Sequence, residues 1–286
     1  MKKKNFGIGV GFAAVLFTAV VLIAFKADEV RQTAAMPAVP QISASQAILV
    51  EAETGEVLYE RNARERAYPA STTKIMTALL VLETLERYDS PIDQVVTVPR
   101  EAEGVEGSSL YLKAGEKIRL EDLLYGLMLQ SGNDSAVALA ILTAGSTENF
   151  VAEMNAKAEE LGCGNTHFVN PNGLFDENHY TTAWDLAQIA REAMRHPMFR
   201  TIVAAPSWDA QREGNDFTHF YNKNKTVHEF RGGNGIKIGY TKASGRTLAA
   251  SAQRDGKELI CVVMGAPNWF NDAYTLMEYG FKRLEE

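Results

Sequence analysis

The chain has 286 residues, of which 46% are apolar and 23% are charged, and its formal net charge is −7. This composition is typical of a globular protein with a sizeable core, organised as one large domain or two small ones. Lys2, Lys3 and Lys4 stand at the N-terminus, and the rest of the chain is more acidic still and carries no basic cluster. The charge balance therefore argues against nucleic acid as a partner.

The N-terminal residues differ in composition from the rest of the chain. The three lysines precede an uncharged, almost wholly apolar stretch, residues 6–25. Basic residues ahead of an apolar run are typical of an export signal, and this run is long enough to span a bilayer. We expect residues 1–26 to be a signal peptide or an uncleaved membrane anchor and residues 27–42 to be a linker. Both alternatives place the body of the protein, residues 43–286, outside the cytoplasm.

The body divides into three blocks. The first is a β-hairpin with strands at residues 46–50 and 57–59. The second is mainly helical, and apolar residues at helical spacing predict helices over residues 72–87, 120–130, 134–144, 148–161 and 182–195. The third is rich in strand-forming residues, which predict strands at 235–241, 247–253 and 258–264 and a closing helix at 269–283. Residues 206–225 show no clear period.

Strands at both ends of the body imply a single antiparallel sheet built from the two ends. The helices between them would form a second lobe, and a cleft would lie where the lobe meets the sheet. The sequence therefore predicts an α+β fold with residues 43–286 as one domain.

Ser71 and Lys74 stand at the start of the first predicted helix. At this spacing both side chains lie on one face of the helix, which suits a hydroxyl nucleophile with an amine as its proton acceptor. Taken alone, the pair is better explained as a helix-capping serine and a solvated lysine.

Two later motifs change that interpretation. Ser131-Gly132-Asn133 lies between two predicted helices, and Lys237-Ile238-Gly239 begins a predicted strand. Each alone is ordinary, the first as a capping loop and the second as an exposed lysine of an edge strand. In this order, at a helix start, an inter-helix loop and a sheet edge, the three motifs would converge on one cleft.

With these motifs the chain resembles the serine-type D-alanyl-D-alanine carboxypeptidases, which are low-molecular-mass penicillin-binding proteins. The resemblance covers residues 43–281 and includes the stretch at 165–174. It implies the β-lactamase/transpeptidase-like form of the α+β fold, with the antiparallel sheet flanked by a mainly helical lobe.

The resemblance implies a role for each motif residue. Ser71 would be the acylated nucleophile and Lys74 its proton acceptor. Ser131 would relay a proton to the leaving amine, and Asn133 would position the substrate amide. Lys237 would supply positive potential near the terminal carboxylate of the substrate.

The strand that follows Lys237 would bind the substrate through Gly239, Tyr240 and Thr241. The backbone amides of Ser71 and Tyr240 would form the oxyanion hole. A lysine acts as a base near neutral pH only if its ammonium form is disfavoured, and burial together with the nearby charge of Lys237 would have that effect on Lys74.

The implied substrate is the peptidoglycan stem peptide, from which terminal D-Ala is removed, and β-lactam antibiotics are the implied inhibitors. The N-terminal segment would associate with the bacterial cytoplasmic membrane, so the enzyme would work at its outer face, anchored or secreted. No cofactor or metal is expected, and the five histidines show no ligand spacing. Cys163 and Cys261 are expected to be two free thiols.

Two departures from the family pattern stand out. Its third motif normally has Thr or Ser at the position of Ile238, and this hydroxyl helps to hold the substrate carboxylate. Losing one such hydrogen bond costs about 1.5–3 kcal/mol if nothing replaces it; Thr241 or Arg246 is a candidate replacement. Many relatives also add a C-terminal β-domain and an anchor helix, whereas this chain ends soon after residue 281, which favours the retained N-terminal anchor.

Two other functions stay open. A class A β-lactamase shares the first two motifs but needs an acid that activates the deacylating water, and no Glu-x-x-Leu-Asn pattern occurs between Gly162 and Tyr180. A non-catalytic or weakly active cell-wall protein that kept the fold is favoured only by Ile238, since the other motif residues are all present.

Overall fold

The structure is a computed structural model that describes residues 38–285, of which Val39–Glu285 form one compact unit. The predicted leader, residues 1–26, and most of the predicted linker lie outside the described residues. Within the described part no single helix is long and apolar enough to cross a membrane, and one pair of helices bent by 86°, Asn133–Ala144 and Thr147–Glu160, passes that test together.

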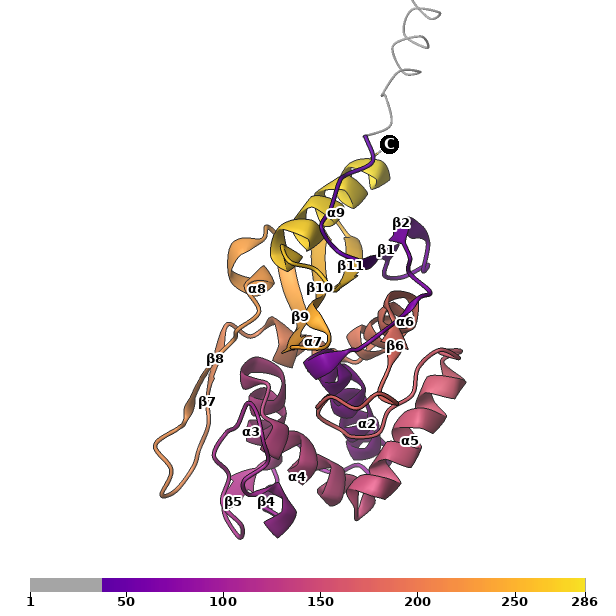
Figure 1. Ribbon diagram of the computed structural model, residues 1–286. Helices are drawn as coiled ribbons and strands as arrows, with labels where there is room; N and C mark the ends of the chain where they lie inside the picture. Colours follow the sequence, from indigo (N-terminus) through magenta and orange to yellow (C-terminus); the bar gives the residue numbers. More distant parts are fainter. Residues whose placement is uncertain (1–37, 286) are drawn as a thin grey trace, which may run out of the picture. The chain divides into compact units, whose positions relative to one another are not determined.

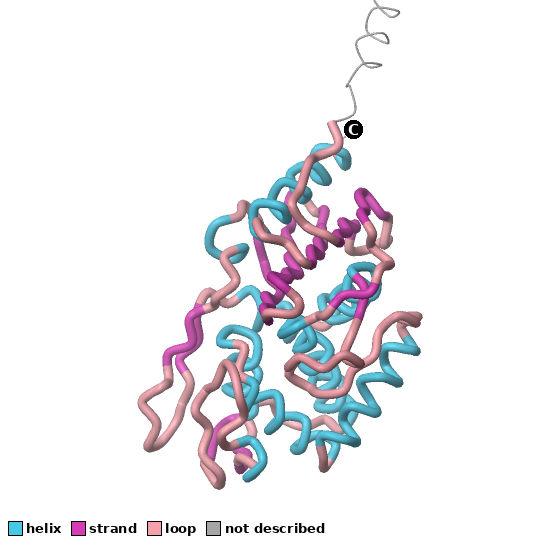
Figure 2. Tube along the Cα trace, viewed as in Figure 1, coloured by secondary structure: helices cyan, strands magenta, loops and turns pink. Residues whose placement is uncertain are grey.

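A five-stranded antiparallel sheet forms the centre of the unit, in the order β2-β1-β11-β10-β9 (Figures 1 and 2). The strands are β1 (Gln46–Glu51), β2 (Val57–Arg61), β9 (Gly233–Thr241), β10 (Gly245–Arg254) and β11 (Lys257–Met264). β1 pairs with β11, so the two ends of the chain share one sheet, as the sequence predicts. β9 is an edge strand, which leaves its outer backbone groups open to a further strand.

The sheet is buried on both faces, and residues along a strand alternate between two apolar clusters. Along β11, Leu259, Cys261 and Val263 pack in the cluster on the side of α9 (Trp269–Leu284). Ile260 and Val262 point into the larger cluster on the other face. That second face is covered by α6 (Ala183–Arg195) and α7 (Pro197–Ala204), so the sheet lies between two helical layers (Figure 1).

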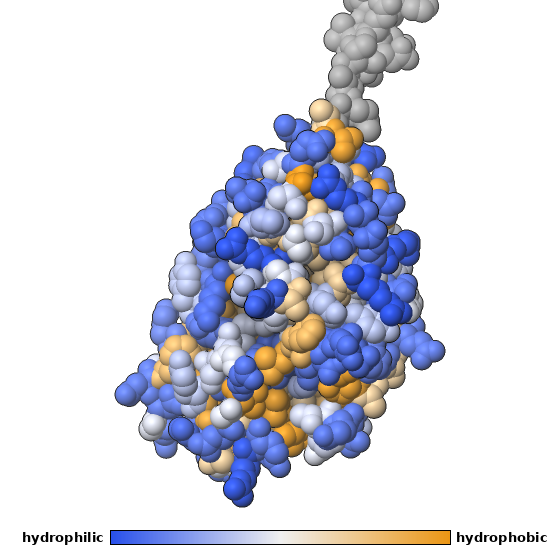
Figure 3. Space-filling model, in the orientation of Figure 1, coloured by the Kyte–Doolittle hydropathy of each residue, from blue (hydrophilic) through white to orange (hydrophobic). Residues whose placement is uncertain are grey.

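The remaining helices form the lobe that the sequence predicts. They are α2 (Lys74–Arg87), α3 (Leu120–Tyr125), α4 (Asn133–Ala144) and α5 (Thr147–Glu160). The face drawn in Figure 3 is mostly hydrophilic, with apolar residues gathered over the helices of this lobe. These findings confirm the predicted α+β fold.

Several local details differ from the predictions. The helix predicted from residue 72 begins with a 3₁₀ turn, η1 (Ala70–Thr73), and the one predicted over 120–130 changes after α3 into a π-helix, η3 (Gly126–Gln130). α7 was not predicted; it starts at Pro197, a position where the missing N–H of proline is harmless. The segment without a clear period contains a hairpin, β7 (Ser207–Asp209) and β8 (His219–Tyr221).

Short pieces account for the other elements that the sequence analysis did not identify. These are β3 (Arg66–Ala67), β4 (Val95–Thr97), η2 (Arg100–Ala102), β5 (Lys117–Arg119), β6 (Thr181–Thr182) and α8 (Thr226–Glu229). Both cysteines are free and buried, as expected. Burial, with a smaller contribution from the charge of Asp185, raises the pKa of the Cys163 thiol to about 12, so this thiol stays protonated and unreactive.

Candidate active site

Ser71 lies on η1, at the point where the helical lobe meets the sheet. The preceding Pro69 carbonyl accepts hydrogen bonds from Thr72 Oγ1 at 2.7 Å and from Thr247 Oγ1 of β10 at 3.1 Å. These bonds attach the 3₁₀ turn to the sheet. Lys74 is the first residue of α2, about one turn after Ser71, so the two side chains lie on the same side. Lys74 Nζ lies 3.1 Å from Ser71 Oγ.

The Lys74 amine has no contact with solvent and three polar partners. Besides Ser71, Nζ donates to Asn133 Oδ1 at 2.6 Å and to the Asn172 carbonyl at 2.6 Å. Burial, and after it the charge of Lys237, holds the pKa of Lys74 well below its ordinary value, against an opposing effect of Asp134. A lysine whose pKa is lowered in this way is able to accept a proton from a neighbouring hydroxyl.

Ser131 and Asn133 follow the π-helix η3. Ser131 adopts a left-handed conformation with φ 65°, which ends the helix and turns the chain into α4. Asn133 is fixed at both ends of its amide, since Nδ2 donates to the Glu106 carbonyl at 2.7 Å while Oδ1 accepts from Lys74. Gly107 fits beside it because a Cβ at that position would lie 2.5 Å from Asn133 Nδ2.

Asp134, the next residue, holds the loop formed by residues 106–112, which contacts Asn133. Its buried carboxylate accepts from the Leu110 and Leu112 amides and from Ser109 Oγ, all within 2.6–3.1 Å. The backbone N–H of Asn133 in turn donates to the Ser108 carbonyl at 2.7 Å. The loop and the start of α4 therefore hold each other in place.

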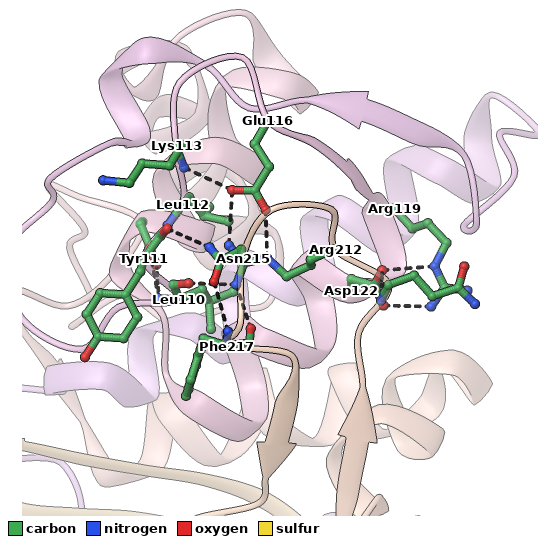
Figure 4. A network of polar contacts seen from close by, with 12 residues as sticks. Leu110, Tyr111, Leu112, Lys113, Glu116, Arg119, Asp122, Arg212, Asn215 and Phe217 are labelled. Atoms are coloured by element: carbon green, nitrogen blue, oxygen red, sulfur yellow. Dashed lines mark hydrogen bonds and ion pairs between the residues drawn. The ribbon is translucent and has the colours of Figure 1, made fainter.

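The β7–β8 hairpin also contacts this loop, through hydrogen bonds and an ion pair of Arg212 (Figure 4). Arg212 donates to Glu116 Oε1 at 2.7 Å and Oε2 at 3.1 Å, and also to the Leu110 carbonyl at 2.7 Å. The side chains of Arg212 and Glu116 are 0% and 6% exposed, so this is a buried bidentate ion pair. Asp122, which accepts from Trp208 Nε1 at 2.7 Å, attaches the base of the hairpin to α3.

Lys237 brings a second buried amine to the site. It lies on β9 opposite Ala249, and its Nζ donates to the Ile238 carbonyl at 3.1 Å. Burial, with an added contribution from the charge of Lys223, lowers the pKa of Lys237 to about 7.

Lys223 is a third amine that the sequence analysis missed. Its Nζ donates to the Gln130 carbonyl at 3.1 Å, and its amide donates to the Leu129 carbonyl at 3.3 Å. Gln130 Nε2 donates a hydrogen bond to the Tyr221 carbonyl at 3.0 Å. The segment after β8 thus holds the end of η3, directly before Ser131.

Gly239 allows β9 to approach Ser71 closely. A Cβ at Gly239 would lie 2.9 Å from the Ser71 amide nitrogen and 2.5 Å from Thr247 Oγ1. Only glycine permits this contact between strand and 3₁₀ turn. Tyr240 follows with an exposed side chain, and Thr241 closes the β9–β10 turn through Ser244.

Ile238 has a structural explanation. It pairs with Leu248, and its side chain packs against the apolar cluster on the α9 side of the sheet. Of the two candidate replacements for the missing hydroxyl, Thr241 Oγ1 bonds Ser244 Oγ at 2.9 Å, and Arg246 donates to the Pro267 carbonyl at 2.7 Å. Both are engaged at the turn rather than beside Ile238.

The structure therefore joins three of the predicted site residues, Ser71, Lys74 and Asn133, by direct hydrogen bonds. Within residues 38–285 no hydrogen bond links Ser131, Lys237 or Tyr240 to Ser71. Asn172 belongs to the stretch that carries the family resemblance, but its backbone carbonyl, which accepts a hydrogen bond from Lys74, has no side-chain signal in the sequence.

The chain is similar in sequence to proteins of one family. Residues 31–268 match the family model described as D-alanyl-D-alanine carboxypeptidase. DacF of Bacillus subtilis is 38% identical over 85% of this chain and 63% of its own length, and DacB2 of Mycobacterium tuberculosis is 33% identical over 89% and 88%. Both carry the name D-alanyl-D-alanine carboxypeptidase. The chain spans 60–63% of the length of DacF and of the Escherichia coli relatives DacC and DacD.

Solved structures give the same result for the fold. A variant of the Streptomyces K15 DD-transpeptidase superposes with a TM-score of 0.79 at 33% identity, over 85% of this chain and all of that one. Penicillin binding protein 6B from Escherichia coli gives a TM-score of 0.80 at 32% identity, over 87% and 81%. The predicted penicillin-binding fold is confirmed.

We predict that Arg212→Met lowers the free energy of unfolding by about 3 kcal/mol, because it leaves the buried Glu116 carboxylate without its partner. Urea denaturation measures the effect. The control is Arg195→Met, which removes a largely exposed pair with Glu192 and is expected to cost less than about 1 kcal/mol. Equal losses for the two variants would contradict the structural role of Arg212.

Proposed function

The chain belongs to the D-alanyl-D-alanine carboxypeptidase family, and from that premise we propose that it is a serine DD-carboxypeptidase. It removes terminal D-Ala from peptidoglycan stem peptides through an acyl-enzyme on Ser71. The observation that carries the proposal is the buried Lys74 amine, 3.1 Å from Ser71 Oγ, with a pKa held well below its ordinary value.

In this mechanism neutral Lys74 accepts the Ser71 proton as Oγ attacks the carbonyl carbon of the penultimate D-Ala. The amides of Ser71 and Tyr240 stabilise the oxyanion. The close contact of Gly239 with the Ser71 amide supports this role, because it brings the strand that carries Tyr240 beside the nucleophile. Collapse of the tetrahedral species expels D-Ala, and water then hydrolyses the acyl ester.

Asn133 and Ser131 act on the two sides of the scissile bond. Nδ2 of Asn133 uses one N–H for the Glu106 carbonyl, so its second N–H is left for a carbonyl of the substrate. Ser131 passes a proton to the leaving amine. Lys237, with Lys223 behind it, supplies positive potential for the terminal carboxylate.

The N-terminal segment supports a site of action at the outer face of the cytoplasmic membrane. Residues 1–26 contain an apolar run long enough to span the bilayer, preceded by three lysines. We propose that this segment exports the catalytic domain and either anchors it or is removed. The same acylation chemistry makes β-lactams inhibitors of the enzyme.

The test is acylation and turnover by one preparation. We expect a penicillin to add its mass to Ser71 and an acyl-D-Ala-D-Ala peptide to release D-Ala. Ser71→Ala should abolish both, whereas Ser90→Ala, remote in the turn after α2, should change neither. Rapid hydrolysis of the penicillin would instead support a β-lactamase, and a protein that takes up no penicillin would support a non-catalytic one.

The pH dependence of kcat/KM tests the coupling between the amines. Activity should fall at low pH as Lys74 becomes protonated, and at high pH as Lys237, with a pKa of about 7, loses its charge. A positive neighbour lowers the pKa of a lysine. Lys223→Met therefore raises the pKa of Lys237, and we expect the alkaline limb to move to higher pH.

Lys225→Met is the control, since Lys225 is exposed and pairs with Glu229. An alkaline limb that stays in place in the Lys223→Met enzyme would contradict the coupling. A general loss of kcat/KM with an unchanged profile would assign Lys223 only to holding the end of η3.

Ile238→Thr tests the departure in the third motif. We expect a stability loss of about 1 kcal/mol from the lost packing on the α9 side. If the hydroxyl reaches the substrate carboxylate over the strand edge, kcat/KM for the peptide rises roughly tenfold. Ile238→Val is the matched control without a hydroxyl, and equal kcat/KM for the two variants would show that the hydroxyl is irrelevant here.

A further inference from the structure

An open cavity of about 520 Å³ lies at the turn between β9 and β10. Its walls come from Tyr240 and Arg246 on the two strands and from Ala266, Pro267 and Trp269 before and at the start of α9. None of the mechanism derived above uses this cavity.

The cavity adjoins the strand that would bind the substrate. Tyr240 pairs directly with Arg246 in the β9–β10 ladder, and the Tyr240 amide belongs to the proposed oxyanion hole. The leaving D-Ala extends from there toward Lys237, which precedes Tyr240 on β9. The part of the stem peptide on the N-terminal side of the scissile bond must therefore run the other way, toward Thr241 and the cavity.

The lining has a defined chemistry. Arg246 is exposed and donates one bond, from Nη1 to the Pro267 carbonyl at 2.7 Å, which leaves most of its five N–H donors free. Its guanidinium lies 5.9 Å from the centre of the Trp269 ring. No Asp or Glu lines the cavity, and Arg246 forms no ion pair within the described residues.

We infer that this cavity is a subsite for the side chain of the stem-peptide residue before D-Ala-D-Ala, and that Arg246 makes it prefer a long side chain ending in a carboxylate. The aromatic and apolar walls accept the aliphatic part, and the guanidinium binds the carboxylate. The inference rests on the proposed function, since it assumes that the stem peptide pairs with β9.

Arg246 was also considered as a replacement for the hydroxyl missing at Ile238. The pairing of β9 with β10 argues against that role. Ile238 pairs with Leu248, two residues along β10 from Arg246, which places Arg246 about 6–7 Å farther along the strand. The Pro267 carbonyl also draws the guanidinium toward α9, away from Lys237. Arg246 is thus on the acyl side of the scissile bond.

Three peptides of the form acetyl-X-D-Ala-D-Ala test the inference, with X as α-aminopimelate, norleucine or lysine. D-Ala release gives kcat/KM for each, and binding to the Ser71→Ala protein gives a Kd that does not depend on turnover. We expect the aminopimelate peptide to be favoured over the norleucine peptide by up to roughly fivefold, and the lysine peptide to be the poorest.

In Arg246→Gln the preference for aminopimelate over norleucine should fall to near one, and Arg246→Lys should keep part of it. Lys242→Gln, which removes an exposed cation from the same turn, should leave the preference intact. Equal use of the three peptides by the unaltered enzyme, or a preference that survives Arg246→Gln, would overturn the subsite.

A loss in Arg246→Gln that is equal for all three peptides would also overturn it, because this pattern is expected of a residue that binds the terminal carboxylate. Failure of the proposed function looks different: the unaltered protein would release D-Ala from none of the peptides and would take up no penicillin.

Discussion

Burial of the Lys74 amine is the constraint on which the rest of the site depends. An ammonium group taken out of water is strongly destabilised unless its donors are paired or its charge is removed. Three oxygens, from Ser71, Asn133 and Asn172, surround this amine, while Lys237 lies close enough to oppose its charge. The hydrogen-bonding groups of the amine are thus paired while its pKa is lowered. A larger fraction of the amine is therefore neutral, and only the neutral form can act as a base.

The arrangement around Lys74 requires that Asn133 keep a fixed position, and several contacts within the helical lobe hold it there. Asn133 is held by the Ser108 and Glu106 carbonyls, and the Asp134 carboxylate fixes the same loop. Arg212, from the β7–β8 hairpin, attaches this loop from outside. A hairpin that contains none of the motif residues therefore helps to hold the amide of Asn133 in place.

The sequence was sufficient to predict the sheet, the main helices and the meeting of Ser71, Lys74 and Asn133, because these have strong periodic or chemical signals. Other features have none. A π-helix keeps the composition of an α-helix, so the change after Tyr125 could not be predicted. Lys223 lies in a segment without hydrophobic period, and its importance comes from contacts with Leu129 and Gln130 that are 93–94 residues away in the chain. The carbonyl of Asn172 acts through the backbone, which any residue supplies.

The concentration of positive charge offers a reason why Ile238 is tolerated. One hydroxyl contributes about 1.5–3 kcal/mol to binding a carboxylate directly, whereas the buried Lys237 and the more exposed Lys223 act on it through their charge, which has a longer range. The depressed pKa of Lys237 reflects first its burial and second the charge of Lys223. In the proposed mechanism the arriving carboxylate favours the charged form of Lys237, so substrate binding raises the pKa of this lysine. An apolar residue at position 238 does not diminish this attraction between opposite charges.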